Sequence, residues 1–97
     1  MSTEESFELP PVSIMNHACK ISIAEDKPIM LDYWLDSLEK KVLIGIKENE
    51  EKLLVKNEEE YTSPIDKIFR LDNVLLICTE NSIYITSAII EKRKISN

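Results

Sequence analysis

Few residues in this sequence are suited to catalysis. His17 is the only histidine, so a Ser/His/Asp or Cys/His centre would have to use it. Cys19 follows two positions later, and on a strand both side chains would share a face, where an imidazole can contact a thiolate. The chain has a single glycine, Gly45, and thus no glycine-rich turn for an oxyanion hole. We predict no catalytic residues and a protein that is not an enzyme.

The spacing of the remaining polar residues does not favour a metal site or a pair of catalytic acids. The two cysteines, Cys19 and Cys78, form no C-x-x-C motif, and both lie in apolar runs, so we expect buried, reduced thiols. The acidic stretches 48–51 and 58–60 lack the spacing of a calcium loop. Asp32 and Asp36 are explained as well by a half-exposed sheet face as by an acid pair. The sequence predicts neither a metal nor a cofactor.

The charge of the chain argues against nucleic-acid and membrane partners. The formal net charge is −6, which repels phosphates. No apolar run approaches the ~20 residues needed to cross a bilayer. The first residues lack the basic and apolar regions of a signal peptide. We therefore expect a cytoplasmic protein without membrane contact, for which nucleic-acid binding is disfavoured.

Aromatic and apolar residues indicate a surface for protein partners. Trp and Tyr are common interface anchors, and small barrels use aromatic grooves to bind peptides. Burial of the only Trp in the core is an equally good reading. The predicted partner-binding residues are Phe7, Leu9, Val12, Met30, Tyr33, Trp34 and Tyr61.

The elements that would position these residues are mostly strands. Alternation predicts a first strand at Cys19, Ile21 and Ile23. Residues 28–41 fit either a strand or a helix; we favour the strand, with one helical turn near 36–41 because Asp36 and Glu39 have capping-box spacing. Further strands are predicted at 42–47, 52–56, 65–71, 74–79 and 83–90. The almost continuously apolar run 74–79 predicts a central strand that is covered on both faces.

Short turns between these segments predict an antiparallel meander, because short connections join antiparallel neighbours. The expected fold class is all-β, a meander that closes into a small SH3-like or OB-like barrel or roll. We divide the chain into an extended N-terminal tail (1–16), a small β domain (17–91) and a short basic C-terminal tail (92–97).

Three segments carry a resemblance to known proteins: DKPIMLDYW (26–34), VLIGIKENEEKLLVKNEEEYTSPI (42–65) and TENSIYITS (79–87). In these stretches the chain resembles short uncharacterised proteins encoded by large DNA viruses of eukaryotes. The resemblance spans most of residues 20–87 and includes no catalytic motif. It implies a virion-associated or capsid-accessory role and transfers no functional residues.

Two functions follow from the sequence. The first is a non-enzymatic protein-interaction or structural module that docks through an apolar and aromatic sheet face and an N-terminal arm, on another protein or on a second copy of itself. The alternative is a small-barrel binder of single-stranded nucleic acid. The alternative predicts a cluster of five lysines beside exposed tyrosines: Lys20, Lys41, Lys47, Lys52 and Lys56.

Overall fold

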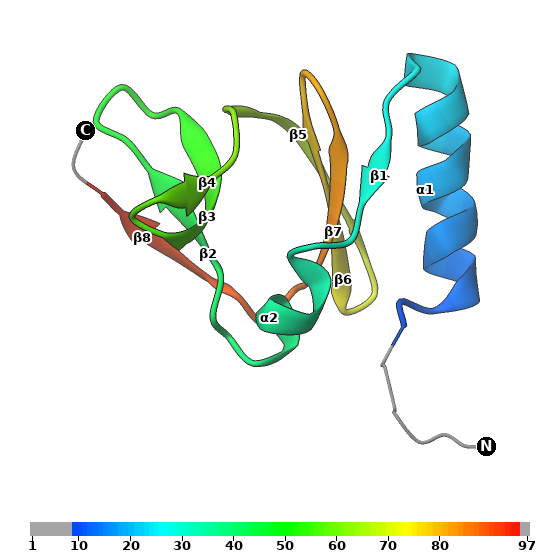
Figure 1. The fold of residues 1–97 in the computed structure, drawn as a ribbon, viewed down its shortest axis with the longest axis horizontal. Coiled ribbons are helices and arrows are strands. Elements are labelled where there is room, and N and C mark those ends of the chain that lie inside the picture. Colours follow the sequence, from blue (N-terminus) through cyan, green and yellow to red (C-terminus); the bar gives the residue numbers. More distant parts are fainter. Residues whose placement is uncertain (1–8, 96–97) are drawn as a thin grey trace.

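A computed structural model describes residues 9–95 (Figure 1). The elements run in the order α1 (Val12–Glu25), β1 (Ile29–Met30), α2 (Trp34–Leu38), β2 (Leu43–Ile46), β3 (Lys52–Asn57), β4 (Glu60–Tyr61), β5 (Ile65–Leu71), β6 (Val74–Thr79), β7 (Ile83–Ser87) and β8 (Glu91–Lys94). The fold is mostly β, but it is not the all-β fold predicted, because α1 and α2 are helices.

The strands form two sheets of four, which we call sheet A (β1-β7-β6-β5) and sheet B (β4-β3-β2-β8). Each sheet contains an antiparallel meander, β5-β6-β7 or β2-β3-β4. The fourth strand of each sheet comes from the other end of the chain and is parallel to its neighbour: β1 pairs with β7, and β8 pairs with β2. The expectation of a purely antiparallel meander was therefore wrong for these two strands.

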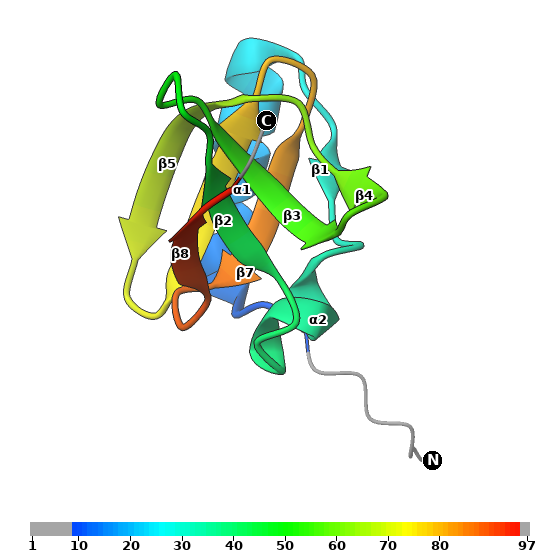
Figure 2. The ribbon, with the colours of Figure 1, turned by 90° about the vertical axis from the view of Figure 1, so that its left-hand side faces the viewer.

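A closed barrel of the SH3-like or OB-like kind is not found in residues 9–95. The two sheets instead pack face to face, and α1 covers the other face of sheet A (Figures 1 and 2). The molecule thus has three layers, with sheet A in the middle.

Strand β6 is buried on both faces, which confirms the prediction for the apolar run 74–79. Side chains alternate along a strand, so its residues divide between two clusters. Leu75 and Ile77 pack between the sheets against residues such as Ile44 and Leu54. Val74 and Leu76 belong to a second cluster under α1, which contains Ile14, Ala18, Trp34 and Ile85.

The predicted first strand at 19–23 and the inner end of the predicted tail are wrong, because these residues belong to α1. The helix buries Ile14 and Ala18 and partly buries Ile21, at the i, i+4, i+7 spacing of one helical face. Cys19, Ile21 and Ile23 also fit a period of two, and this alternation is why a strand was predicted here. The C-cap Asp26 adopts a left-handed conformation, and its N–H donates to the Ser22 carbonyl.

Residues 28–41 combine both of the predicted alternatives. They contain the short strand β1 and then α2, which begins at Trp34, upstream of the expected helical turn. The Ser37 hydroxyl is buried in α2, donates to the Trp34 carbonyl at 2.6 Å, and accepts the Ser87 N–H of β7 at 2.8 Å. This side chain joins α2 to sheet A.

The predicted basic C-terminal tail is also corrected by the structure. Residues 91–94 form β8, at an edge of sheet B, and Ile95 continues the pairing by donating its N–H to the Ile46 carbonyl. The preceding strand is shorter than expected and ends at Ser87. None of the helices described in residues 9–95 has the length and apolarity required to cross a membrane.

Candidate binding groove on sheet B

The predicted aromatic patch around Trp34 is not on the surface. Trp34 and Tyr33 are each only 6% exposed, and they lie in the two core clusters. Met30 is partly buried in β1. These side chains fill the core of a small domain and are not accessible to a partner. The prediction that they bind a partner was therefore wrong. Phe7 lies outside the described residues.

The remaining predicted contact residues are exposed but far apart in the fold. Leu9, three residues before α1, is 73% exposed, and Val12, the first residue of α1, is 75% exposed. Figure 1 shows α1 on the outer side of sheet A. Tyr61 is 59% exposed on β4, in sheet B. Tyr61 lines a hollow in the surface.

The possible contact between His17 and Cys19 is lost in the helix, where residues two apart point in different directions. Both side chains are exposed, so the expectation of a buried Cys19 was wrong. Cys78 is a free, buried thiol on β6, and burial raises its pKa, which disfavours the reactive thiolate. Residues 9–95 contain no group of three His, Cys, Asp or Glu side chains placed to hold a metal ion.

A groove of about 700 Å³ runs over the outer face of sheet B. Its apolar floor follows from strand register: Leu43, Val55 and Tyr61 are aligned across β2, β3 and β4, on the face opposite to the buried pair Ile44 and Leu54. In the part of the chain that the structure describes, no helix or strand lies over this face (Figure 2).

Gly45 and Ile95 shape one end of the groove. A Cβ atom at Gly45 would lie 2.7 Å from Ile95 Cδ1, so the absence of a side chain lets Ile95 lie flat across β2. The floor is thereby extended by an apolar residue that follows the last strand. A second, smaller hollow adjoins this end, over the β2–β3 turn.

The rim of the groove is mostly cationic. Four of its lining residues are basic and one is acidic, Glu58; the basic residues are Lys47, Lys56, Arg93 and Lys94. Lys56 Nζ lies 3.3 Å from the Asp36 carboxylate and 4.7 Å from the centre of the Tyr33 ring, which is part of the core between the sheets. The Lys56 ammonium is therefore directed away from the groove, and the charges at the rim come from the other three basic residues. Lys47 and Arg93 pair with Glu51 and Glu91, whereas Lys94 has no ion-pair partner in residues 9–95. In a chain of net charge −6, this rim is a local exception.

The sequence contained part of the signal for this groove. Tyr61 was predicted correctly as exposed, but Leu43 and Val55 were assigned only by strand periodicity. Nothing in the local sequence indicates that β8 lies beside β2, and this pairing brings Arg93, Lys94 and Ile95 to the groove. The groove is therefore a product of long-range strand pairing.

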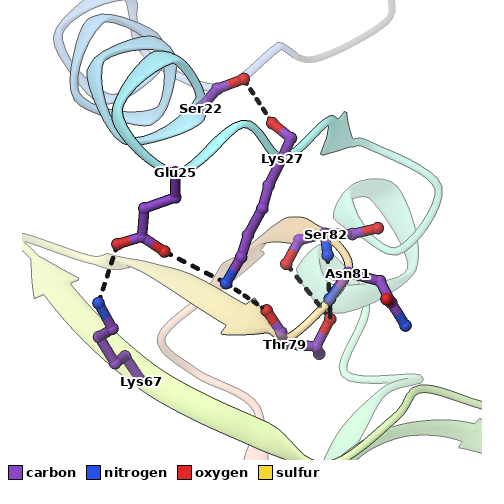
Figure 3. A network of polar contacts seen from close by, with 7 residues as sticks. All are labelled: Ser22, Glu25, Lys27, Lys67, Thr79, Asn81 and Ser82. Carbon is purple, nitrogen blue, oxygen red and sulfur yellow. Dashed lines mark hydrogen bonds and ion pairs between the residues drawn. The ribbon is translucent and has the colours of Figure 1, made fainter.

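A separate polar network fastens α1 to sheet A (Figure 3). The Glu25 carboxylate pairs with Lys67 Nζ at 2.8 Å and Lys27 Nζ at 3.2 Å, and Lys27 Nζ also donates to the Thr79 carbonyl at 2.7 Å. The hydrogen bond from Lys67 lowers the pKa of Glu25, with a further contribution from Lys27. This stabilisation is present above the ordinary carboxylate pKa and is lost as the pH falls through the lowered value. The network has a structural role at the end of α1.

Comparison with known proteins provides no family assignment. The chain has no significant match to a family model, to a curated protein or to a solved structure.

Proposed function

We propose that this protein is a non-enzymatic interaction module that binds an extended, acidic peptide segment of a partner protein in the groove on sheet B. The observation that carries the proposal is an apolar floor with a cationic rim on an otherwise acidic molecule. An extended segment presents apolar and acidic side chains on opposite faces, so it can meet floor and rim together.

The floor supplies the contact area for such a segment. Leu43, Val55 and Tyr61 lie side by side across three strands, and Tyr61 keeps a large exposed surface. Covering this surface removes apolar area from water, at roughly 25 cal/mol per Å². Tyr also combines a large contact area with few rotatable bonds, which suits an anchor.

The rim supplies selectivity for carboxylates. Lys94 has no ion-pair partner among the residues that the structure describes. The pairs made by Lys47 and Arg93 are exposed, and an exposed ion pair contributes only about 0–1 kcal/mol. Exchange of these partners for carboxylates of a bound segment therefore costs little. Complementary charge also accelerates association and makes it salt-dependent.

Single-stranded nucleic acid is less well matched to the structure. The five lysines expected for such a binder do not form one cluster, since Lys20 lies on α1 while Lys47 and Lys52 lie at the β2–β3 turn. Stacking of successive bases needs several exposed aromatic rings, and Tyr61 is the one aromatic residue that lines the groove. The net charge of −6 further opposes phosphate binding.

The test is a titration of the isotope-labelled full chain, followed by NMR, with a six-residue peptide of alternating Glu and Leu. We expect shifts of the Leu43 and Val55 methyl groups and a Kd on the order of 10–100 µM, which corresponds to roughly −6 kcal/mol. Added salt should weaken the binding. Tyr61→Ala should weaken it at least about fivefold, because it removes the anchor.

Controls separate this function from its alternatives. Phe69→Ala removes another partly exposed ring, on sheet A, and should leave binding unchanged. A peptide with Lys in place of Glu should not bind. No shift at the groove with the acidic peptide would refute the proposal, and tighter binding of a single-stranded oligothymidine would favour the nucleic-acid function. The resemblance to viral proteins suggests particle assembly as the setting.

A further inference from the structure

We propose that the natural occupant of the groove is the N-terminal segment, residues 1–8, of a second copy of this chain. The inference rests on the proposed function and names its partner. It would make the protein a self-associating module in which copies exchange their N-terminal arms.

The composition of the segment complements the groove. Residues 1–8 (MSTEESFE) contain Glu4, Glu5 and Glu8 and no Lys or Arg, and they complement a groove whose rim carries Lys47, Arg93 and Lys94. Phe7 supplies a large apolar side chain for the floor. On an extended chain Leu9 lies on the same side as Phe7, and it is 73% exposed, so most of its surface is available for contact with another copy.

The position of α1 favours binding of the N-terminal segment in the groove of a second copy over binding in the groove of its own molecule. Figure 1 shows α1 on the outer side of sheet A, whereas the groove is on the outer side of sheet B, so both sheets lie between them. Eight extended residues reach at most about 28 Å. A path around a helix about 10 Å wide and two sheets about 10 Å apart uses most of that reach before the groove is entered.

Exchange of two arms gives a closed assembly. Each copy offers one arm and one groove, so a dimer with two-fold symmetry satisfies both at once. The two contacts form cooperatively, because the second is intramolecular once the first is made. We therefore expect dimers rather than open chains.

Charge reversal tests the exchange in the full-length chain by light scattering and sedimentation. Wild type should change from monomer to dimer as concentration rises. The arm variant E4K/E5K/E8K and the groove variant K47E/K94E should each shift this transition at least about tenfold to higher concentration. Phe7→Ala should do the same without changing any charge, since it removes the apolar contact.

Mixing the two charge-reversed variants distinguishes two copies from one. In a mixed dimer, the basic arm of E4K/E5K/E8K meets the acidic groove of K47E/K94E, and the unchanged acidic arm of K47E/K94E meets the unchanged basic groove of E4K/E5K/E8K. Both contacts are attractive, so the mixture should dimerise again. The matched control K20E/K40E changes the net charge equally, outside the groove, and should dimerise like wild type. Circular dichroism verifies that each variant is folded.

A wild-type chain that stays monomeric at all concentrations, or variants that fail to pair when mixed, would overturn the inference. The proposed function is judged separately, by the methyl shifts with the Glu-Leu peptide. If the chain stays monomeric but still binds this peptide, the proposed function stands, and the groove binds a different protein in place of a second copy.

Discussion

At the scale of single residues, two buried threonines show how position decides what a hydroxyl contributes. Thr79 and Thr86 are 1% and 0% exposed. The Thr79 oxygen accepts the backbone N–H groups of Asn81 and Ser82, which holds the turn after β6. The Thr86 hydroxyl is buried without a hydrogen-bond partner among the described residues. A buried hydroxyl without a partner costs stability, whereas one that satisfies backbone donors contributes to it.

The same isosteric substitution should therefore have opposite effects at these two positions. Thr86→Val is expected to raise the free energy of unfolding by about 1 kcal/mol, because it removes an unsatisfied polar group. Thr79→Val should lower it by about 1–3 kcal/mol, because two backbone donors lose their acceptor. Urea unfolding followed by circular dichroism measures both. Destabilisation of similar size by both variants would contradict the assignment.

At the scale of elements, α1 has limited attachment to the sheet that it covers. Its buried side chains include Ile14 and Ala18, while Val12 and Ile23 on the other side are among the most exposed apolar residues. The network of Glu25, Lys27 and Lys67 fastens its C-terminal end to β5 and β6 (Figure 3). Local openings of this helix should depend on that network.

Lys27→Met should loosen the C-terminal end of α1 because it removes the donor to Thr79 and one partner of Glu25. We expect about fivefold faster amide hydrogen exchange in this part of the helix, equivalent to about 1 kcal/mol. Lys20→Met, on the exposed side of α1, is the matched control and should leave the exchange unchanged. Equal acceleration in both variants would show that the network does not hold the helix.

At the scale of the whole molecule, packing of the two sheets depends on a core that contains two tyrosines. The rings of Tyr33 and Tyr84 meet edge to face, with centres 5.4 Å apart. Burial raises the pKa of Tyr33 to about 12 and also raises the pKa of Tyr84. The folded state therefore favours the neutral phenols. Ionisation of these tyrosines at alkaline pH should weaken the packing of the two sheets.

The sign of the pH effect follows from proton linkage. Above about pH 10 the unfolded tyrosine releases its proton while the folded one keeps it, so stability falls as the pH rises toward 12. Tyr33 alone should contribute a slope of about 1.4 kcal/mol per pH unit. Urea unfolding across this range measures it, and Tyr33→Phe should reduce the slope. An unchanged slope in this variant would rule out Tyr33 as its source.

The predictable part of the fold is local. Strands β2, β3, β5, β6 and β7 and their short turns were predicted near their observed positions, because alternation and turn residues act over a few neighbours. The buried β6 was also predicted, since a continuous apolar run needs cover on both faces. Of the described residues that the sequence predicted to bind a partner, Tyr61 is the one that lines the groove.

Neighbouring residues and composition account for the predominance of strands, the hairpins β2–β3, β5–β6 and β6–β7, and the acidic charge. Tertiary structure decided that residues 19–23 are helical, that Trp34 is buried and that β8 pairs with β2 to complete the groove. The physical reason is that these outcomes depend on partners far along the chain. The apolar run of β6 indicates that both of its faces are covered, but it does not identify the segments that cover them, and a parallel neighbour leaves no mark in the local pattern of side chains.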